Sequence, residues 1–242
     1  MDVQKNKQKN KQKNKQKNKQ KMIVIAIDGP AASGKGTLAR GLAQRLGYAH
    51  MDTGALYRAV ASEVLQDGGD CRSEPDALRG CARLQDKISG SEGLRALNNP
   101  DLRDDAVAQG ASLVAALPLV REALIEVQRG FSENPGAGYA GAVLDGRDIG
   151  TVICPHADVK LFVTAGDEIR AERRRKELQS KGIDVTYGAV LADMRDRDAR
   201  DSGRKAAPLK PADDAVMLDT TGLNAEEALA KALQIVEDAL KN

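Results

Sequence analysis

A glycine-rich stretch near the start of the chain, "IAIDGPAASGKGT" (residues 25–37), combines the residue types that bind phosphate groups. Its glycines let successive backbone N–H groups point into one concavity, and a helix that begins directly afterwards adds the positive end of its dipole. The lysine adds a mobile charge that can reach the β and γ phosphates, and the threonine lies near where Mg²⁺ would be held. The sequence therefore predicts a nucleoside triphosphate site made of Gly29, Pro30, Ala31, Ala32, Ser33, Gly34, Lys35, Gly36 and Thr37.

The end of this loop is unusual in the position of its hydroxyl residue. Thr37 follows Lys35 with Gly36 between them, whereas GTPases and many ATPases have serine or threonine directly after the lysine. The "GKGT" ending resembles that of nucleoside monophosphate kinases. This resemblance implies a small phosphorylated acceptor and not water or a protein switch.

A second segment, "MDTGALYR" (51–58), follows the second expected strand. Asp52 or Thr53 can cap the N-terminus of the next helix with its side chain. Tyr57 and Arg58 then lie one turn into that helix. Arg58 has two possible roles, a solvated helix residue or a ligand of an acceptor phosphate. The presence of a phosphate loop in the same chain favours the second.

A third segment, "VLDGRDIGT" (143–151), places Asp145, Arg147 and Asp148 at the carboxyl end of a buried strand. A carboxylate there can orient Mg²⁺, directly or through water, and a guanidinium can clamp a phosphate with two N–H bonds. A salt-bridged turn is the plainer alternative. Three charged residues among glycines after a buried strand favour a site, with Thr37 and Asp145 as the magnesium ligands.

A fourth segment, "RDRDARDSGR" (195–204), runs from a helix into a glycine turn. Arg197, Arg200, Asp201 and Arg204 share one face if the helix continues that far. Taken alone, i,i+4 pairs of Asp and Arg would make an ordinary salt-bridged helix. Beside a triphosphate loop, we expect instead a mobile arginine lid that closes over the phosphates and excludes water.

A fifth segment, "ASLVAALPLVREAL" (111–124), places Ser112 and Arg121 on either side of a proline in a mostly apolar setting. Taken in order and spacing, these five segments resemble the bacterial cytidylate kinase family over about residues 22 to 240. The glycine loop is shared by many kinases, whereas the Ser112/Arg121 segment and "DGRD" are more specific.

The resemblance implies phosphoryl transfer from ATP·Mg²⁺ to CMP or dCMP, giving ADP and CDP or dCDP. It implies a monophosphate pocket, with two arginines on the acceptor phosphate, formed by Thr53, Tyr57, Arg58 and Arg147. It implies that the cytosine edge meets Ser112, Arg121 and Asp148, that the ribose meets Arg197 and Asp201, and that Arg204 closes with the lid. The expected catalytic set is Lys35, Arg58, Arg147, Arg197 and Arg204.

The hydrogen-bonding groups of the expected base-reading residues are consistent with cytosine as the base. Asp148 can accept a hydrogen bond from an exocyclic amine, while Ser112 and Arg121 can donate to the carbonyl and ring nitrogen. No general base is needed, because an acceptor phosphate is already an anionic nucleophile. Two departures from the family pattern are Thr53, where serine is usual, and a short insert over 86–104. The insert places the strictness of base selection in question.

The elements that position these segments alternate along the chain. Apolar runs predict strands over 22–27, near 48–52, and over 141–145, 158–163 and 215–219. Helical patterns fill 35–47, 54–66, about 104–116, 118–130, 167–179, 186–200 and 224–240. Such alternation predicts an α/β fold, a three-layer phosphate-loop kinase with a parallel central sheet. Residues 68–103 break the rhythm and are expected to be a small monophosphate-binding insert, and about 180–205 the lid.

Composition limits the remaining function classes. Residues 1–21 carry +8 of the formal net charge of +2, which leaves −6 for the rest and disfavours a basic nucleic-acid face. Aromatic residues make up 2%, which disfavours base-stacking platforms. The four "KNKQ" repeats predict a disordered tail. No specific nucleic acid, membrane or metal cluster is expected, and we expect a cytoplasmic monomer with three unpaired thiols.

Three alternative functions remain open from the sequence. A related kinase would phosphorylate UMP or another small acceptor. A non-catalytic nucleotide sensor would need a damaged site, yet the lysine and arginines of the loop, strand and lid segments are all present. An RNA-tethered module would use the tail and would bind RNA with strong salt dependence.

Overall fold

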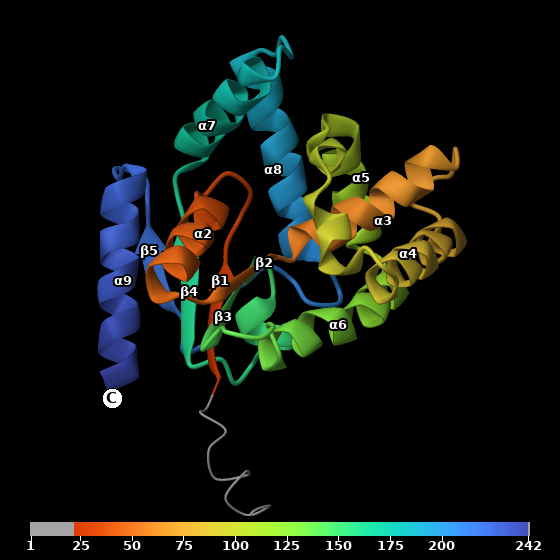
Figure 1. Cartoon of the computed structure of the whole chain (residues 1–242). Helices are drawn as coiled ribbons and strands as arrows, with labels where there is room; N and C mark the ends of the chain where they lie inside the picture. The colour runs from red at the N-terminus through yellow and green to blue at the C-terminus, as the bar shows by residue number, and fades with distance from the viewer. Residues whose placement is uncertain (1–21, 242) are drawn as a thin grey trace, which may run out of the picture.

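The central sheet of the computed structural model, which describes residues 22–241, is entirely parallel. Its strand order is β2-β3-β1-β4-β5 (Figure 1). β1 (Ile23–Asp28) lies in the centre between β3 (Gly141–Gly146) and β4 (Val159–Thr164), with β2 (Ala49–Asp52) and β5 (Val216–Asp219) outermost. All carboxyl ends therefore meet at one edge, where ligands of such sheets bind. The predicted α/β class is confirmed.

One face of the sheet is covered by α2 (Lys35–Leu46) and α9 (Ala225–Lys241). Alternate residues of a strand point to opposite faces, so Ile25 and Ile27 enter this core together with Val143 from β3. Leu42 of α2 is fully buried against them. This core lies behind the glycine loop and fixes the strand and helix that flank it.

The other face carries a larger core beneath four helices: α3 (Gly54–Gln66), α4 (Glu74–Ser89), α5 (Asp105–Val114) and α6 (Pro118–Glu133). Ala26 and Leu144 point into it from the strands, and Leu56, Val60 and Leu124 meet them from the helices. Aliphatic side chains and alanines make up most of this core, in agreement with the low aromatic content.

Within the expected insert of 68–103, the first half forms a helix that the sequence patterns did not predict. α4 is a regular 16-residue helix, with Ser73 as N-cap accepting a hydrogen bond from the backbone N–H of Asp76 at 3.4 Å and with proline in its first turn. Ser followed by Glu and Pro is a helix-start signal that the glycines and proline nearby obscured. Two 3₁₀ turns follow, Gly93–Asn98 and Pro100–Arg103.

Beyond the carboxyl ends of the strands, α7 (Asp167–Ser180) and α8 (Tyr187–Gly203) form a separate pair (Figure 1). They pack through a small apolar cluster of Ala171, Leu178, Val190 and Met194. A π-helical turn, Ile149–Ile153, follows β3. Within residues 22–241 no helix is long and apolar enough to span a bilayer. The three cysteines are buried free thiols, as expected, and the predicted disorder of 1–21 lies outside the described residues.

Candidate active site

The glycine loop follows β1 and ends at α2, as predicted. Gly29 has φ 152°, and a Cβ there would lie 2.0 Å from the carbonyl oxygen of Val163, so the position admits only glycine. Gly34 caps α2 in the left-handed region, with φ 89°. Lys35 Nζ donates to the carbonyl of Pro30 at 3.2 Å and folds back over the loop. This is the geometry of a backbone cradle for phosphate with a cation at its rim.

The loop separates two cavities. Lys35 and Gly36 line one of about 210 Å³, whereas Gly34 and Thr37 line another of about 270 Å³ on the side of α9. Ser33 is fully buried and its carbonyl accepts from Thr220 Oγ1 at 2.9 Å, which ties the loop to the segment after β5. The predicted nucleotide-binding residues are therefore divided between two cavities.

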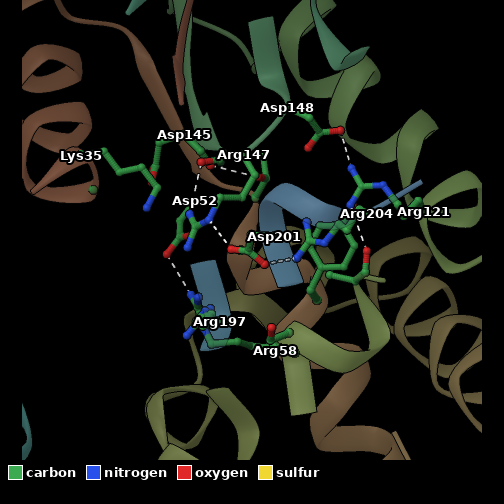
Figure 2. A pocket seen from close by; sticks show the side chains of 18 residues that line it. Lys35, Asp52, Arg58, Arg121, Asp145, Arg147, Asp148, Arg197, Asp201 and Arg204 are labelled. Carbon is green, nitrogen blue, oxygen red and sulfur yellow. Dashed lines mark hydrogen bonds and ion pairs between the residues drawn. The ribbon is translucent and has the colours of Figure 1, made fainter. Parts of the chain in front are cut away.

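The first cavity, called here the acceptor pocket, brings together thirteen of the predicted site residues (Figure 2). They come from the loop, α3, α5, α6, the end of β3 and α8, segments up to 169 positions apart in the sequence. The thirteen are Lys35, Gly36, Thr53, Tyr57, Arg58, Ser112, Arg121, Asp145, Arg147, Asp148, Arg197, Asp201 and Arg204. The other seven predicted residues lie in the glycine loop outside this pocket.

Positive charge exceeds negative charge in the acceptor pocket. Six cationic side chains line it against four carboxylates. Lys35 is only half-buried as a residue, yet desolvation by burial, aided by the charge of Arg147, lowers its pKa to about 7. Burial and the same neighbour lower the pKa of Arg197 to about 10. Burial and mutual repulsion destabilise the charged forms of Lys35 and Arg197, and an anion bound in the cavity would relieve both effects.

Asp201 organises the arginines at the centre of the pocket. Arg147 Nε donates to Asp201 Oδ2 at 2.9 Å, and Arg204 pairs with the other carboxylate oxygen (Figure 2). Burial alone would raise the pKa of Asp201, but the charges of Arg147, Arg204 and Arg197 hold it below its usual range. Arg197 Nε is buried without a hydrogen-bond partner among residues 22–241, which leaves this nitrogen available to a ligand.

Within the pocket Arg121 and Asp148 form a buried ion pair. Arg121 also donates to the carbonyl of Ala115 at 3.2 Å, and its guanidinium carbon lies 5.5 Å from the ring centre of Tyr57. Ser112 Oγ is buried beside them and has no partner within the described chain. A donor, an acceptor and a free hydroxyl thus converge on one space, as a base-reading site requires.

Of the two residues expected to cap the next helix, Thr53 is the N-cap residue of α3, so the position is right. The side-chain capping bond expected there is absent. Thr53 Oγ1 instead donates to the carbonyl of Asp145 at 2.8 Å and joins α3 to the end of β3. Asp52 pairs with Arg58 at 2.8 Å and so sets the direction of that guanidinium in the pocket.

Asp28 is a functional residue that sequence reasoning missed. Its two carboxylate oxygens accept the backbone N–H groups of Ile149 and Gly150, each at 2.8 Å, and thereby fix the turn that carries Arg147 and Asp148. The available signal was its place at the end of β1, since β1 and β3 are neighbours and their carboxyl ends coincide. Burial is the main reason that the pKa of Asp28 rises to about 6.

The raised pKa of Asp28 predicts a specific pH dependence of stability. Between about pH 4 and 6 the carboxyl is ionised in the unfolded chain and protonated in the folded one, so stability falls as pH rises. Relative to an Asp28→Asn variant, the wild type should lose roughly 1.4 kcal/mol of unfolding free energy for each pH unit in this window. Urea unfolding of both proteins at pH 4, 5, 6 and 7 measures this difference. A pH-independent difference would contradict the assignment.

The predicted magnesium ligands suit a hydrated ion held mainly by its nucleotide. Asp145 is buried, with Oδ1 bonded to His50 Nε2 at 2.7 Å and Oδ2 3.6 Å from the position of a Cβ on Gly36. Thr37 is exposed at the start of α2. Residues 22–241 contain no group of three or more His, Cys, Asp or Glu side chains that could cage a metal. One carboxylate and one hydroxyl beside a phosphate cradle fit Mg²⁺, which keeps most of its waters.

Comparison with known proteins agrees with this geometry. The family model described as "Cytidylate kinase" matches residues 25–238. The chain belongs to the cytidylate kinase family. A cytidylate kinase of Methylocella silvestris is 56% identical over 90% of this chain and 95% of that relative, and one of Paramagnetospirillum magneticum is 54% identical over 88% and 97%. Membership in the cytidylate kinase family confirms the resemblance drawn from the five segments.

A solved structure supports the fold alone. An uncharacterized protein from Eubacterium ventriosum superposes with a TM-score of 0.51, covers 90% of this chain and 99% of its own, and is 13% identical. The parallel sheet flanked by helices is thus shared with a protein of very different sequence. The assignment of this chain to a class of kinases comes from its family membership and not from this structural similarity.

Proposed function

We propose that this chain transfers the γ-phosphoryl group of ATP to CMP or dCMP, giving ADP and CDP or dCDP. The observation that carries the proposal is the acceptor pocket, in which an excess of cationic side chains lies beside a buried Arg121–Asp148 pair and the free hydroxyl of Ser112. The cationic side chains suit the acceptor phosphate, and the Arg121–Asp148 pair with Ser112 suits the edge of a cytosine. The alternative of a sensor with a damaged site loses support, because the cations converge.

The residues of the pocket divide the work of transfer. The acceptor phosphate needs no deprotonation, so positioning and charge stabilisation carry the rate. Arg58 and Arg147 hold that phosphate, and Lys35 lies between it and the glycine loop. Arg197, whose buried Nε has no partner among the described residues, stabilises the negative charge of the phosphoryl group in the transition state. Bound Mg²⁺ would supply neutralisation of the triphosphate next to Thr37 and Asp145.

Base selection follows from the order of donors and acceptors. Cytosine presents an exocyclic amine beside a ring nitrogen that accepts, and Asp148 and Arg121 offer the complementary acceptor and donor side by side. Uracil reverses both groups, so it would set a carbonyl against Asp148 and an N–H against Arg121. A pocket that leaves buried polar groups unmatched rejects such a base strongly.

The nucleoside of ATP belongs in the second cavity. That cavity opens between Gly34 and Thr37 of the loop and Arg173, Thr220 and Leu223 near the start of α9. Arg173 is anchored by its bond to the Thr220 carbonyl at 2.8 Å, which leaves its charged plane as one wall. A triphosphate that lies along the loop would then carry its γ-phosphoryl group from this side towards the acceptor pocket.

A coupled assay of ADP formation tests the proposal with the chain from Met22 onward. Turnover with CMP and dCMP, and at least 100-fold lower kcat/KM with UMP or AMP, is expected from the unmatched hydrogen bonds. Comparable rates with UMP would favour the related kinase instead. Absence of turnover with all four acceptors, repeated with the full chain, would refute the kinase assignment. RNA binding that is lost with residues 1–21 would support the tethered-module alternative.

ATP binding should also be linked to proton uptake. Because the Lys35 pKa is lowered to about 7, this ammonium is mostly deprotonated at pH 8 in the free protein. Triphosphate favours the charged form, so binding should take up close to one proton (~0.9) at pH 8. Calorimetry in two buffers of different ionisation enthalpy measures this number. The same uptake in a Lys35→Met variant would show that another group is responsible.

Further parts of the proposal concern organisation. We assign residues 68–103 to a small monophosphate-binding insert and about 180–205 to a lid, because the first borders α3 and the second contributes Arg197, Asp201 and Arg204 to the pocket. We propose a cytoplasmic monomer, since the acceptor pocket is complete within one chain. Size-exclusion chromatography with light scattering tests the monomer, and a stable dimer would contradict it.

A further inference from the structure

A buried arginine of α7 joins the glycine loop to α8, and the proposed chemistry does not use it. Arg170 is 4% exposed. Its Nη1 donates to the carbonyl of Ala31 in the loop at 3.2 Å, and its Nε donates to the carbonyl of Ala165 at the end of β4 at 3.0 Å. The guanidinium therefore holds the loop through the backbone carbonyl of Ala31 and leaves the backbone N–H groups of the phosphate cradle free of this contact.

The remaining nitrogen of Arg170, Nη2, contacts one carboxylate on its own helix and one on α8. Nη2 bonds to Asp167 Oδ1 at 2.6 Å and lies 2.7 Å from Asp198 Oδ2 on α8. The planar fork of a guanidinium fixes the relative directions of its N–H groups, which lysine cannot do. One side chain thus links the strand end, the glycine loop and α8 with defined geometry.

Apolar contacts reinforce this link. Ala31 and Ala32 of the loop pack against the cluster of Ala171, Leu178, Val190 and Met194 that joins α7 to α8. Ala32 has φ 55°, a left-handed conformation that is costly for a residue with a side chain. The loop conformation is therefore held by its surroundings, and Arg170 is the polar part of that support.

We infer that Arg170 is a positioning residue that couples the triphosphate loop to the arginines of the acceptor pocket through its contacts with Ala31 and Asp198. Asp198 directly follows Arg197 on α8, and the two side chains point to different faces of the helix. Fixing Asp198 against Arg170 fixes the direction in which Arg197 enters the pocket. The inference rests on the proposed function in its assignment of ATP to the loop.

The first test replaces Arg170 with methionine, which keeps much of the apolar stem and removes every hydrogen bond. The Kd of ATP, measured by calorimetry without acceptor, should rise about tenfold, because a charge-assisted bond to the loop is lost. Turnover should fall by about a further tenfold as Arg197 is released, while the Kd of CMP measured alone stays within twofold. Arg175→Met is the matched control, since Arg175 pairs with Glu172 of its own helix at 2.9 Å.

The second test separates the two contacts with Asp198→Asn. This variant leaves the bond to Ala31, so the Kd of ATP should stay within twofold while turnover falls about fivefold. In the Arg170→Met background the same substitution should change turnover less than twofold, because its partner is already missing. Thermal unfolding of all four proteins establishes that each is folded.

Several results would overturn the inference. Folded Arg170→Met with ATP affinity and turnover within twofold of the wild type would do so, and so would an equal loss of ATP and CMP affinity. Additive effects in the double variant would show that Asp198 acts independently of Arg170. The ATP binding measurements need no turnover, so they remain decisive even if the wild type does not phosphorylate CMP.

Discussion

Replacing Lys35 with methionine should lower kcat about a thousandfold, the largest effect expected of any single substitution in this chain. Lys35 is the cation between the glycine loop and the acceptor pocket, and transfer of a phosphoryl group depends almost wholly on such preorganised charge. The loss should fall on kcat far more than on the Kd of CMP, because the acceptor phosphate keeps Arg58 and Arg147. Single-turnover kinetics with saturating ATP and CMP measures it.

The same substitution should not weaken the fold. An ammonium whose pKa is lowered by burial is a cost to the folded state, so removing it should leave the free energy of unfolding at pH 7 unchanged or higher. Lys231→Met, at an exposed position of α9, is the matched control and should keep full activity. Retention of more than a tenth of the wild-type kcat by Lys35→Met would refute its proposed role.

Replacing Asp148 with asparagine should reduce the preference for CMP over UMP about a hundredfold. The asparagine can turn its amide to donate to the uracil carbonyl, whereas the cytosine amine loses a charged acceptor. Most of the change should be a fall in kcat/KM for CMP. Initial rates with both acceptors in one assay give the ratio directly.

The Asp148→Asn variant also leaves the buried Arg121 guanidinium without its counter-charge. Breaking such a pair typically destabilises by about 3–5 kcal/mol, so assays belong well below the lowered midpoint of unfolding. Asp213→Asn, at an exposed position, is the control for a lost surface charge and should leave the preference intact. An unchanged CMP-to-UMP ratio in folded Asp148→Asn would show that base selection lies elsewhere in the pocket.

Local patterns predicted every strand and every α-helix of residues 22–241 except α4. The strand expected over 22–27 is Ile23–Asp28, and the helix expected over 54–66 is Gly54–Gln66. Each chemical segment was tied to the end of a strand or the start of a helix, and parallel strands bring such ends to one edge. The convergence of Arg58, Arg121 and Arg197 follows from that rule together with the family resemblance.

Long-range partners were what the sequence concealed. Asp28 acts on Ile149 across 121 positions, and Arg170 acts on Ala31 across 139. The sequence shows that Asp28 ends a strand, but not that its carboxylate is buried against backbone N–H groups, nor that one arginine of an arginine-rich helix points inward. The side-chain capping bond expected of Thr53 is absent for the same reason, because its hydroxyl bonds to the distant carbonyl of Asp145 and not to the N-terminus of α3.

The residues on the two sides of the glycine loop are supported by different hydrophobic cores. Donor residues on the α9 side rest on the core of Ile25, Ile27 and Leu42, while acceptor residues rest on the core beneath α3 to α6. Substitutions within one of these cores can therefore accumulate with little effect on the other, provided that the Arg170 contacts joining the loop to α8 are kept. A lineage descended from this chain could acquire a new phosphate acceptor by remodelling α3, α5 and α6 alone, with the machinery that delivers the phosphoryl group carried forward unchanged.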